Sequence, residues 1–138
     1  IMPSLVGSEM CIRDRSRDYL YGRLLAIAEH IEYTALPDEE KRKRMTNAAR
    51  FMHRFANYPF ETWRTIELSL TPYRERLISK KRGIFIKLEK EMDSIMSAFK
   101  HEDFVSSEKL TAEFLLGYHC QRKANFKTKE IETSTETN

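Results

Sequence analysis

The chain has 138 residues, which is enough for one domain and too few for two of ordinary size. Charged residues make up 33% and apolar residues 41%, whereas glycine and proline occur only four times each, a composition typical of a soluble, helix-rich domain. No apolar run approaches the roughly 18 residues that span a bilayer, which excludes a membrane-spanning segment. The net charge of +3 is too small to identify a partner.

Residues 1–15 differ from the rest of the chain. They show no helical period, and they lack the cationic start, the apolar stretch and the cleavage site of a secretory signal. Their sequence resembles a translated sequencing adapter, so we interpret them as an artefact in front of a C-terminal fragment of a larger protein. On this interpretation Cys120 is a single thiol without an intramolecular disulfide, which fits a reducing cytoplasm.

Apolar residues recur at helical spacing from Ser16 onward, and they predict two helices before residue 58. The first is expected over residues 17–34, with Ser16 as its N-cap and a stop at Leu36-Pro37-Asp38. The second is expected as one helix over residues 39–57. Acidic residues stand at its start, where the helix dipole favours negative charge.

Three further helical segments follow. One begins near Pro59, because proline suits a first helical position. The helical spacing of its apolar residues continues past Pro72, so this proline marks either a kink in one long helix or a break between two short ones. The next is expected over residues 84–100. The last is expected over residues 107–122, with Ser107 as its N-cap.

The sequence therefore predicts an all-α fold, a bundle of about five helices over residues 16–122. No stretch alternates as a strand would, and each amphipathic helix must bury one face against a neighbour. Residues 123–138 are polar and rich in Thr, Lys and Glu, and we expect them to form a flexible, disordered tail.

The sequence offers no pattern typical of catalysis. It lacks a glycine-rich phosphate loop, a His-Glu-x-x-His motif, a Cys-x-x-Cys motif and a nucleophile elbow. The adjacent His119 and Cys120 would point about 100° apart on a helix, which disfavours a shared metal ion. We therefore expect no enzyme activity, no metal and no cofactor.

The basic residues are better organised than the acidic ones. Lys43, Arg50 and Arg54 are spaced as one helical stripe, and no acidic residue lies between Lys41 and Arg54. Cations on a rigid helix can follow a phosphate backbone without reading its sequence. An ordinary solvated face is the alternative. The residues predicted to bind nucleic acid are Lys41, Arg42, Lys43, Arg44, Arg50, Arg54, Arg64, Arg74, Lys80, Lys81 and Arg82.

Three patterns resemble, in order, the C-terminal region of the large subunit of the type I-C CRISPR interference complex (Cascade). They are Tyr19-Leu20-x-Gly22-Arg23-Leu24-x-Ala26-x-x-Glu29, then Arg50-Phe51 with Ala56-x-x-Pro59-x-x-x-Trp63, and Leu116-Gly117-Tyr118-His119-x-Gln121-Arg122. Gly22 and Gly117 are expected to let their two segments pack closely. Arg23 and Glu29 are expected to pair, if at all, with other segments. The motif residues carried over are Gly22, Arg23, Glu29, Pro59, Gly117, Tyr118, Gln121 and Arg122.

The resemblance implies a non-catalytic, cytoplasmic subunit of an antiviral complex, from a region that type I-C systems also translate separately as the small subunit. Its implied partners are the crRNA-bound Cascade backbone subunits, the single strands of the target DNA R-loop, and, as a further candidate, the recruited helicase–nuclease, with no membrane. Backbone contacts would stabilise an R-loop that is nearly balanced energetically. The alternative is a protein–protein scaffold bundle without direct nucleic-acid contact.

Overall fold

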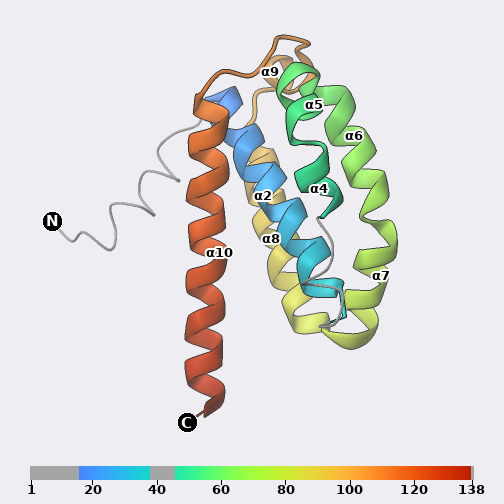
Figure 1. The fold of residues 1–138 in the computed structure, drawn as a ribbon, viewed down its shortest axis with the longest axis vertical. Helices are drawn as coiled ribbons and strands as arrows, with labels where there is room; N and C mark the ends of the chain where they lie inside the picture. Colours follow the sequence, from blue (N-terminus) through green and yellow to red (C-terminus); the bar gives the residue numbers. More distant parts are fainter. Residues whose placement is uncertain (1–15, 38–45, 138) are drawn as a thin grey trace, which may run out of the picture.

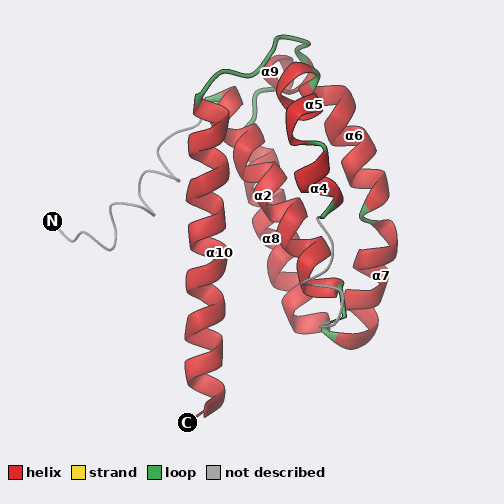
Figure 2. Cartoon of the chain, in the orientation of Figure 1, coloured by secondary structure: helices red, strands yellow, loops and turns green. Residues whose placement is uncertain are grey.

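The computed structural model describes residues 16–37 and 46–137, with side chains up to residue 125. Every regular element in this part of the chain is an α-helix (Figure 2), so the all-α prediction is confirmed. Five of the described helices have ten residues or more, which matches the number expected but not every range. The helices are α2 (Arg17–Ala35), α4 (Asn47–Arg50), α5 (Met52–Asn57), α6 (Pro59–Ser69), α7 (Thr71–Lys80), α8 (Arg82–Ala98), α9 (His101–Val105) and α10 (Glu113–Thr137).

Helix α2 is the centre of the bundle. Helix α10 packs along one side of it, and α4, α6, α7 and α8 pack against the rest (Figure 1). The expected N-cap is confirmed, because Ser16 Oγ accepts a hydrogen bond from the Tyr19 N–H at 3.4 Å. The buried surface of this helix is wider than the single apolar face expected from the sequence, because Leu25 and Ala26 are buried as well as Leu24 and Ile27. A helix buried around most of its circumference must have neighbours on several sides.

The helical spacing of apolar residues that runs through Pro72 belongs to two short helices and not to one kinked helix. Leu70 separates α6 from α7, and Pro72 lies in the first turn of α7. Because proline has no N–H to donate and its ring crowds the preceding turn, it begins a helix more readily than it continues one. The two helices still follow each other down the same edge of the bundle (Figure 1).

The expected single helix over residues 39–57 is wrong where the structure describes it. Two short helices, α4 and α5, meet at Phe51 instead. Helix α4 starts where Thr46 Oγ1 accepts from the Ala49 N–H at 3.1 Å, and the buried Glu32 of α2 accepts from the Asn47 N–H at 2.7 Å. A contact to another helix therefore fixes this start. Residues 38–45, including the predicted cations 41–44, lie outside the described residues.

The last segment also differs from its prediction. Residues 106–112 form an irregular connector between α9 and α10, and α10 begins at Glu113, so the expected N-cap at Ser107 is wrong. Helix α10 then runs to Thr137, past the expected helix end at residue 122. Asn125, at the start of the expected tail, is buried and donates a hydrogen bond to the Ala26 carbonyl at 3.4 Å. The packed region therefore includes at least this residue.

None of the described helices combines the length and the apolar character that crossing a bilayer requires.

Candidate nucleic-acid interface and the motif interface

The first and third motifs meet where α2 and α10 cross. A Cβ atom added to Gly22 would lie 2.0 Å from the Phe114 carbonyl oxygen, and one added to Gly117 would lie 2.0 Å from the Tyr19 carbonyl oxygen. Each glycine thus faces the backbone of the opposite helix, and no side chain fits at either position. The expectation that Gly22 and Gly117 allow close packing is confirmed.

Polar motif side chains continue this interface below the glycines. Arg23 Nε donates to Gln121 Oε1 at 3.0 Å, and Gln121 Nε2 donates to Glu91 Oε1 of α8 at 2.6 Å and to Asn125 Oδ1 at 3.1 Å. Burial lowers the pKa of Arg23, and the Glu91 carboxylate acts in the opposite direction. Because Gln121 is only 1% exposed, this network fixes the register of three helices.

A second polar group joins the same two helices. The Tyr118 hydroxyl donates to Glu29, and Arg122 Nε lies 3.5 Å from Glu29 Oε1. The Arg122 guanidinium also lies 5.5 Å from the centre of the Tyr118 ring. Arg23 and Glu29 therefore pair with residues of α10, as expected. Pro59, the remaining motif residue, is buried at the first position of α6.

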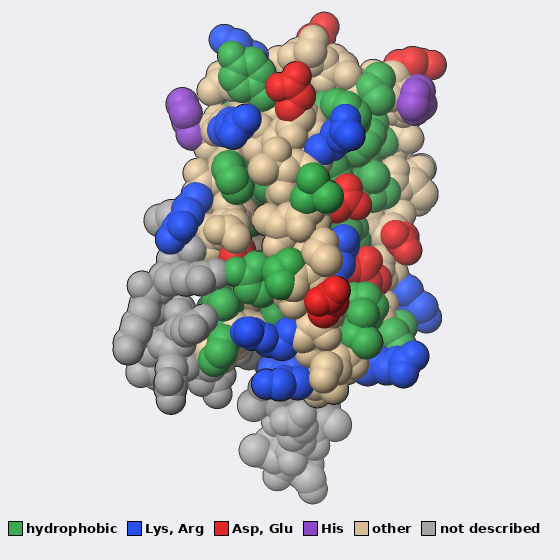
Figure 3. All heavy atoms as spheres, turned by 90° about the vertical axis from the view of Figure 1, so that its right-hand side faces the viewer, with side chains coloured by type: hydrophobic (Ala, Val, Ile, Leu, Met, Phe, Trp, Pro, Cys, Tyr) green, Lys and Arg blue, Asp and Glu red, His purple; other side chains and the backbone are tan. Residues whose placement is uncertain are grey.

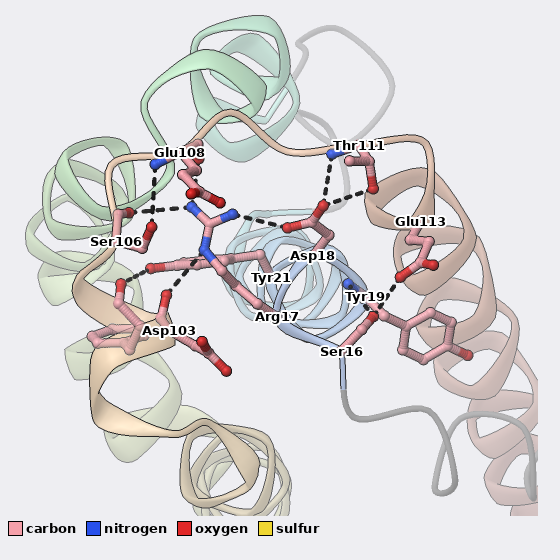
Figure 4. Close-up of polar contacts among 11 residues, drawn as sticks. Ser16, Arg17, Asp18, Tyr19, Tyr21, Asp103, Ser106, Glu108, Thr111 and Glu113 are labelled. Atoms are coloured by element: carbon pink, nitrogen blue, oxygen red, sulfur yellow. Dashed lines mark hydrogen bonds and ion pairs between the residues drawn. The ribbon is translucent and has the colours of Figure 1, made fainter.

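The N-terminal turn of α2 holds the connector by a cluster of hydrogen bonds that we call the Arg17 clasp, comprising Arg17, Asp18 and the backbone that they bind (Figure 4). Arg17 Nε donates to the Asp103 carbonyl at 2.9 Å, and its second terminal nitrogen donates to the carbonyls of Ser106 and Glu108. Its other terminal nitrogen pairs with Asp18 Oδ1 at 2.9 Å. One guanidinium thus binds the backbone at the end of α9 and at the start of the connector.

Asp18 completes the clasp on the side of α10. Its Oδ2 accepts from the Thr111 N–H at 2.8 Å and from Thr111 Oγ1 at 2.6 Å, while Ser16 Oγ donates to Glu113 at 2.6 Å (Figure 4). Sequence reasoning missed Arg17 and Asp18 because their partners lie more than 80 residues away. The one local signal was a charged pair directly after an N-cap.

Four cations gather at the turn between α7 and α8, and we call them the basic end cluster: Arg76, Lys80, Lys81 and Arg82. They are exposed and lie beside the C-terminal end of α2, where Arg76 donates to the Ala35 carbonyl at 3.2 Å and Lys81 to the Thr34 carbonyl at 3.4 Å. Three of them line a pocket of about 210 Å³ whose described lining includes no carboxylate. Figure 3 shows Lys and Arg side chains concentrated at this lower end.

The other predicted cations do not extend this cluster into one track over the described residues. Arg50 and Arg54 are exposed near the opposite end of α6 and α7, which together span about 30 Å. Arg64 lies between Glu61 and Glu67 on α6 and stacks over Phe60 at 5.9 Å. Arg74 forms an ion pair with Glu89 at 2.7 Å, so its charge is already compensated. Lys41, Arg42, Lys43 and Arg44 lie outside the described residues.

Sequence comparison identifies the family. Residues 9–126 match the model of the family described as CRISPR-associated protein (Cas_Csd1). The chain belongs to this family. The match includes all three motifs, and it confirms the resemblance to a type I-C Cascade protein. No curated protein matches the chain.

Membership in the Cas_Csd1 family makes the chain a CRISPR-Cas Cascade subunit, whose partners are other subunits of the complex. The matched range begins inside residues 1–15, which lie outside the described residues, so their interpretation as an adapter stays a prediction. The motif residues of this Cas_Csd1 chain on α2 and α10 form the interface between these two helices, and Pro59 begins α6. The surface cations are therefore the candidates for nucleic-acid contact.

Cys120 differs from the expectation of a single thiol. It is disulfide-bonded, and the described part of the chain contains no free cysteine. The other cysteine of the sequence, Cys11, lies outside the described residues. The expectation of a single thiol depended on leaving residues 1–15 out of the cysteine count, and these residues lie outside the described part of the chain. No group of three or more metal-ligating side chains forms among the residues that the structure describes.

The Tyr118 phenol predicts a loss of stability at high pH. Burial and the hydrogen bond to Glu29 raise its pKa above the ordinary value of 10.0. The unfolded chain therefore loses this proton first as the pH rises above 10, and the folded state loses stability relative to it. In urea titrations followed by circular dichroism, we expect Tyr118→Phe to flatten this decline by up to about 1.4 kcal/mol per pH unit.

Tyr58→Phe is the matched control, because Tyr58 is 59% exposed and its replacement should leave the slope of stability against pH unchanged. Some decline remains in Tyr118→Phe, because burial also raises the pKa of Tyr21. Equal slopes for the wild-type chain and Tyr118→Phe would contradict the prediction.

Proposed function

We propose that this Cascade subunit is non-catalytic and contacts the single strands of the target DNA R-loop through phosphates bound at the basic end cluster. The observation that supports this proposal is the cluster itself. Three of its exposed cations stand at the turn between α7 and α8, the fourth, Arg76, precedes them on α7, and the described lining of the pocket holds no carboxylate. Phosphate contacts of this kind position a strand and carry no sequence information.

The geometry of the cluster favours binding over simple solvation. Arg76 and Lys81 are held in place by the last carbonyls of α2, where the helix dipole also favours positive charge. Lys80 and Arg82 form no ion pair with any described residue. Two cations are thus positioned and two are available, which reduces the side-chain entropy lost when a phosphate binds. Because R-loop formation is nearly balanced, a few such contacts can shift it.

Arg50 and Arg54 form a second, smaller contact in this proposal. Both are exposed, and neither forms an ion pair with a described residue. Arg64 and Arg74 contribute less, because carboxylates surround the first and Glu89 pairs with the second. A role for the run 41–44 remains a sequence prediction, as does recruitment of the helicase–nuclease. The proposal places the protein in the cytoplasm with the crRNA-bound complex.

A protein–protein scaffold without nucleic-acid contact is the second candidate. The exposed apolar side chains of α10 favour it, since Leu115 is 46% exposed and Leu116 is 62% exposed. Adjacent exposed leucines on a helix are typical of a contact with another subunit. Both roles are compatible with a Cascade subunit, so the measurement must test DNA directly.

Charge reversal at the basic end cluster separates the two candidates. We expect the double variant Lys80→Glu and Arg82→Glu to weaken binding of a single-stranded oligothymidylate by at least about tenfold. The slope of log K against log salt should fall by about 1.4, because each phosphate contact with a single strand contributes about 0.7. Fluorescence anisotropy across a salt series measures both quantities. Among the described residues, neither Lys80 nor Arg82 donates a hydrogen bond to a helix carbonyl, so the fold should be unaffected.

The control reverses two cations elsewhere, Lys100→Glu with Lys109→Glu, which are exposed at the opposite end of the bundle. This control has the same net charge as the test variant. Equal weakening in both variants would show a non-specific charge effect and contradict the assigned site. No binding by the wild-type chain would favour the scaffold.

A further inference from the structure

A pocket of about 360 Å³ between α6, α7 and α8 is not used by the proposed DNA contact. Its apolar lining includes Trp63, Phe85 and Met92. The Trp63 side chain is buried, with 1% of its surface exposed. Its indole N–H has no hydrogen-bond partner among the described residues. A buried donor without an acceptor costs folding free energy. Because Trp63 lines the pocket, its indole group reports on changes there.

The polar lining of the same pocket is acidic. Glu67, Glu89 and Asp93 contribute three carboxylates, and Arg74 contributes one cation, which leaves two negative charges. Arg74 is already held by Glu89 at 2.7 Å. Glu67 and Asp93 are exposed at the rim and stay available to a cation. This charge repels phosphate, although the chain as a whole carries a net charge of +3.

From these observations we propose that the pocket receives an arginine or lysine side chain of a partner protein in the complex. The aliphatic stem of such a residue would cover Phe85 and Met92, as long cationic side chains do on apolar surfaces. Its charged head would meet Glu67 and Asp93 at the rim. An acidic rim over an aromatic floor is also the arrangement that favours a cation over a ring.

Two other occupants fit less well. A strand of nucleic acid would bring phosphates against Glu67 and Asp93. A metal ion would need three ligating side chains close together, and none of the described residues form such a group. The inference is independent of the proposed DNA contact, which involves the turn between α7 and α8.

Trp63 itself provides the readout, because it is the single tryptophan of the chain. Its indole N–H gives one isolated resonance in a nitrogen–proton correlation spectrum of the full chain. We expect N-acetyl-glycyl-arginyl-glycinamide to shift this resonance in a saturable, salt-sensitive manner. The glutamyl tripeptide of the same design should leave it unchanged. Tryptophan fluorescence should follow the same titration curve.

Glu67→Gln combined with Asp93→Asn should weaken the response to the arginyl peptide by about fivefold. Glu102→Gln on α9 is a control that removes one carboxylate outside the pocket, and it should respond as the wild-type chain does. The inference is overturned if the arginyl peptide leaves the indole resonance in place or if the double variant responds as the wild type does. A shift caused equally by the glutamyl peptide, or by a single-stranded oligothymidylate, would also overturn it.

Discussion

Gly22→Ala is expected to lower the free energy of unfolding by about 3 kcal/mol. The added methyl group would lie 2.0 Å from the Phe114 carbonyl oxygen and 2.6 Å from the Tyr118 backbone nitrogen. Backbone atoms of a packed helix cannot rotate away as the end of a side chain can, so α10 must shift as a whole. That shift would also disturb the Arg23–Gln121 and Tyr118–Glu29 hydrogen bonds. Urea denaturation followed by far-ultraviolet circular dichroism measures the change.

Gly83→Ala is the matched control for this substitution. Nothing lies within 4 Å of the position of its Cβ atom, so alanine should be neutral or stabilising by up to about 1 kcal/mol through its higher helix propensity. Gly117→Ala should resemble Gly22→Ala, because its Cβ atom meets the Tyr19 backbone. If Gly22→Ala and Gly83→Ala changed stability equally, the proposed helix crossing would be wrong.

Arg17→Met is expected to destabilise the chain by about 3 kcal/mol, because it removes one guanidinium from three backbone carbonyls and from Asp18. The methionine keeps most of the aliphatic volume and a high helix propensity. The loss therefore reports the polar contacts of the clasp. Amide hydrogen exchange should show faster exchange at Thr111, whose N–H is bound to Asp18.

Arg82→Met provides the comparison, since Arg82 occupies the first position of α8 as Arg17 occupies the first position of α2. Arg82 is exposed, so this change should alter stability by less than about 0.5 kcal/mol. A similar small effect at Arg17 would mean that the connector keeps its conformation without the clasp.

The sequence predicted those parts of the fold that depend on local patterns. Helix α2 was expected over residues 17–34 and is Arg17–Ala35, and α8 was expected over residues 84–100 and is Arg82–Ala98. Ser16 and Pro59 mark the starts of helices because a side-chain acceptor and a fixed φ act within one turn. The close packing at Gly22 and Gly117 could also be predicted, since a glycine within a helix costs free energy that close packing can offset.

The parts that failed depend on contacts between distant residues. Ser107 could have begun a helix, but the Arg17 clasp holds residues 106 and 108 by their carbonyls. The segment before residue 58 could have formed one helix, but Glu32 binds the first N–H of α4. Arg74 was predicted to bind nucleic acid, but Glu89 of another helix pairs with it. No periodicity within a single segment reveals such partners.

The pairing of α2 with α10 has a consequence for synthesis of the protein on the ribosome. The hydrogen bond of Arg23 to Gln121 joins residues 98 positions apart, and the bond of Asn125 to the Ala26 carbonyl joins residues 99 positions apart. Neither bond can form until the later residue has been synthesised. At about 5–20 residues per second, translation leaves one side of the nascent α2 uncovered for roughly 5–20 s. Closure of the bundle is therefore a late, long-range event, and a helical protein of this kind should fold more slowly than its helix content suggests.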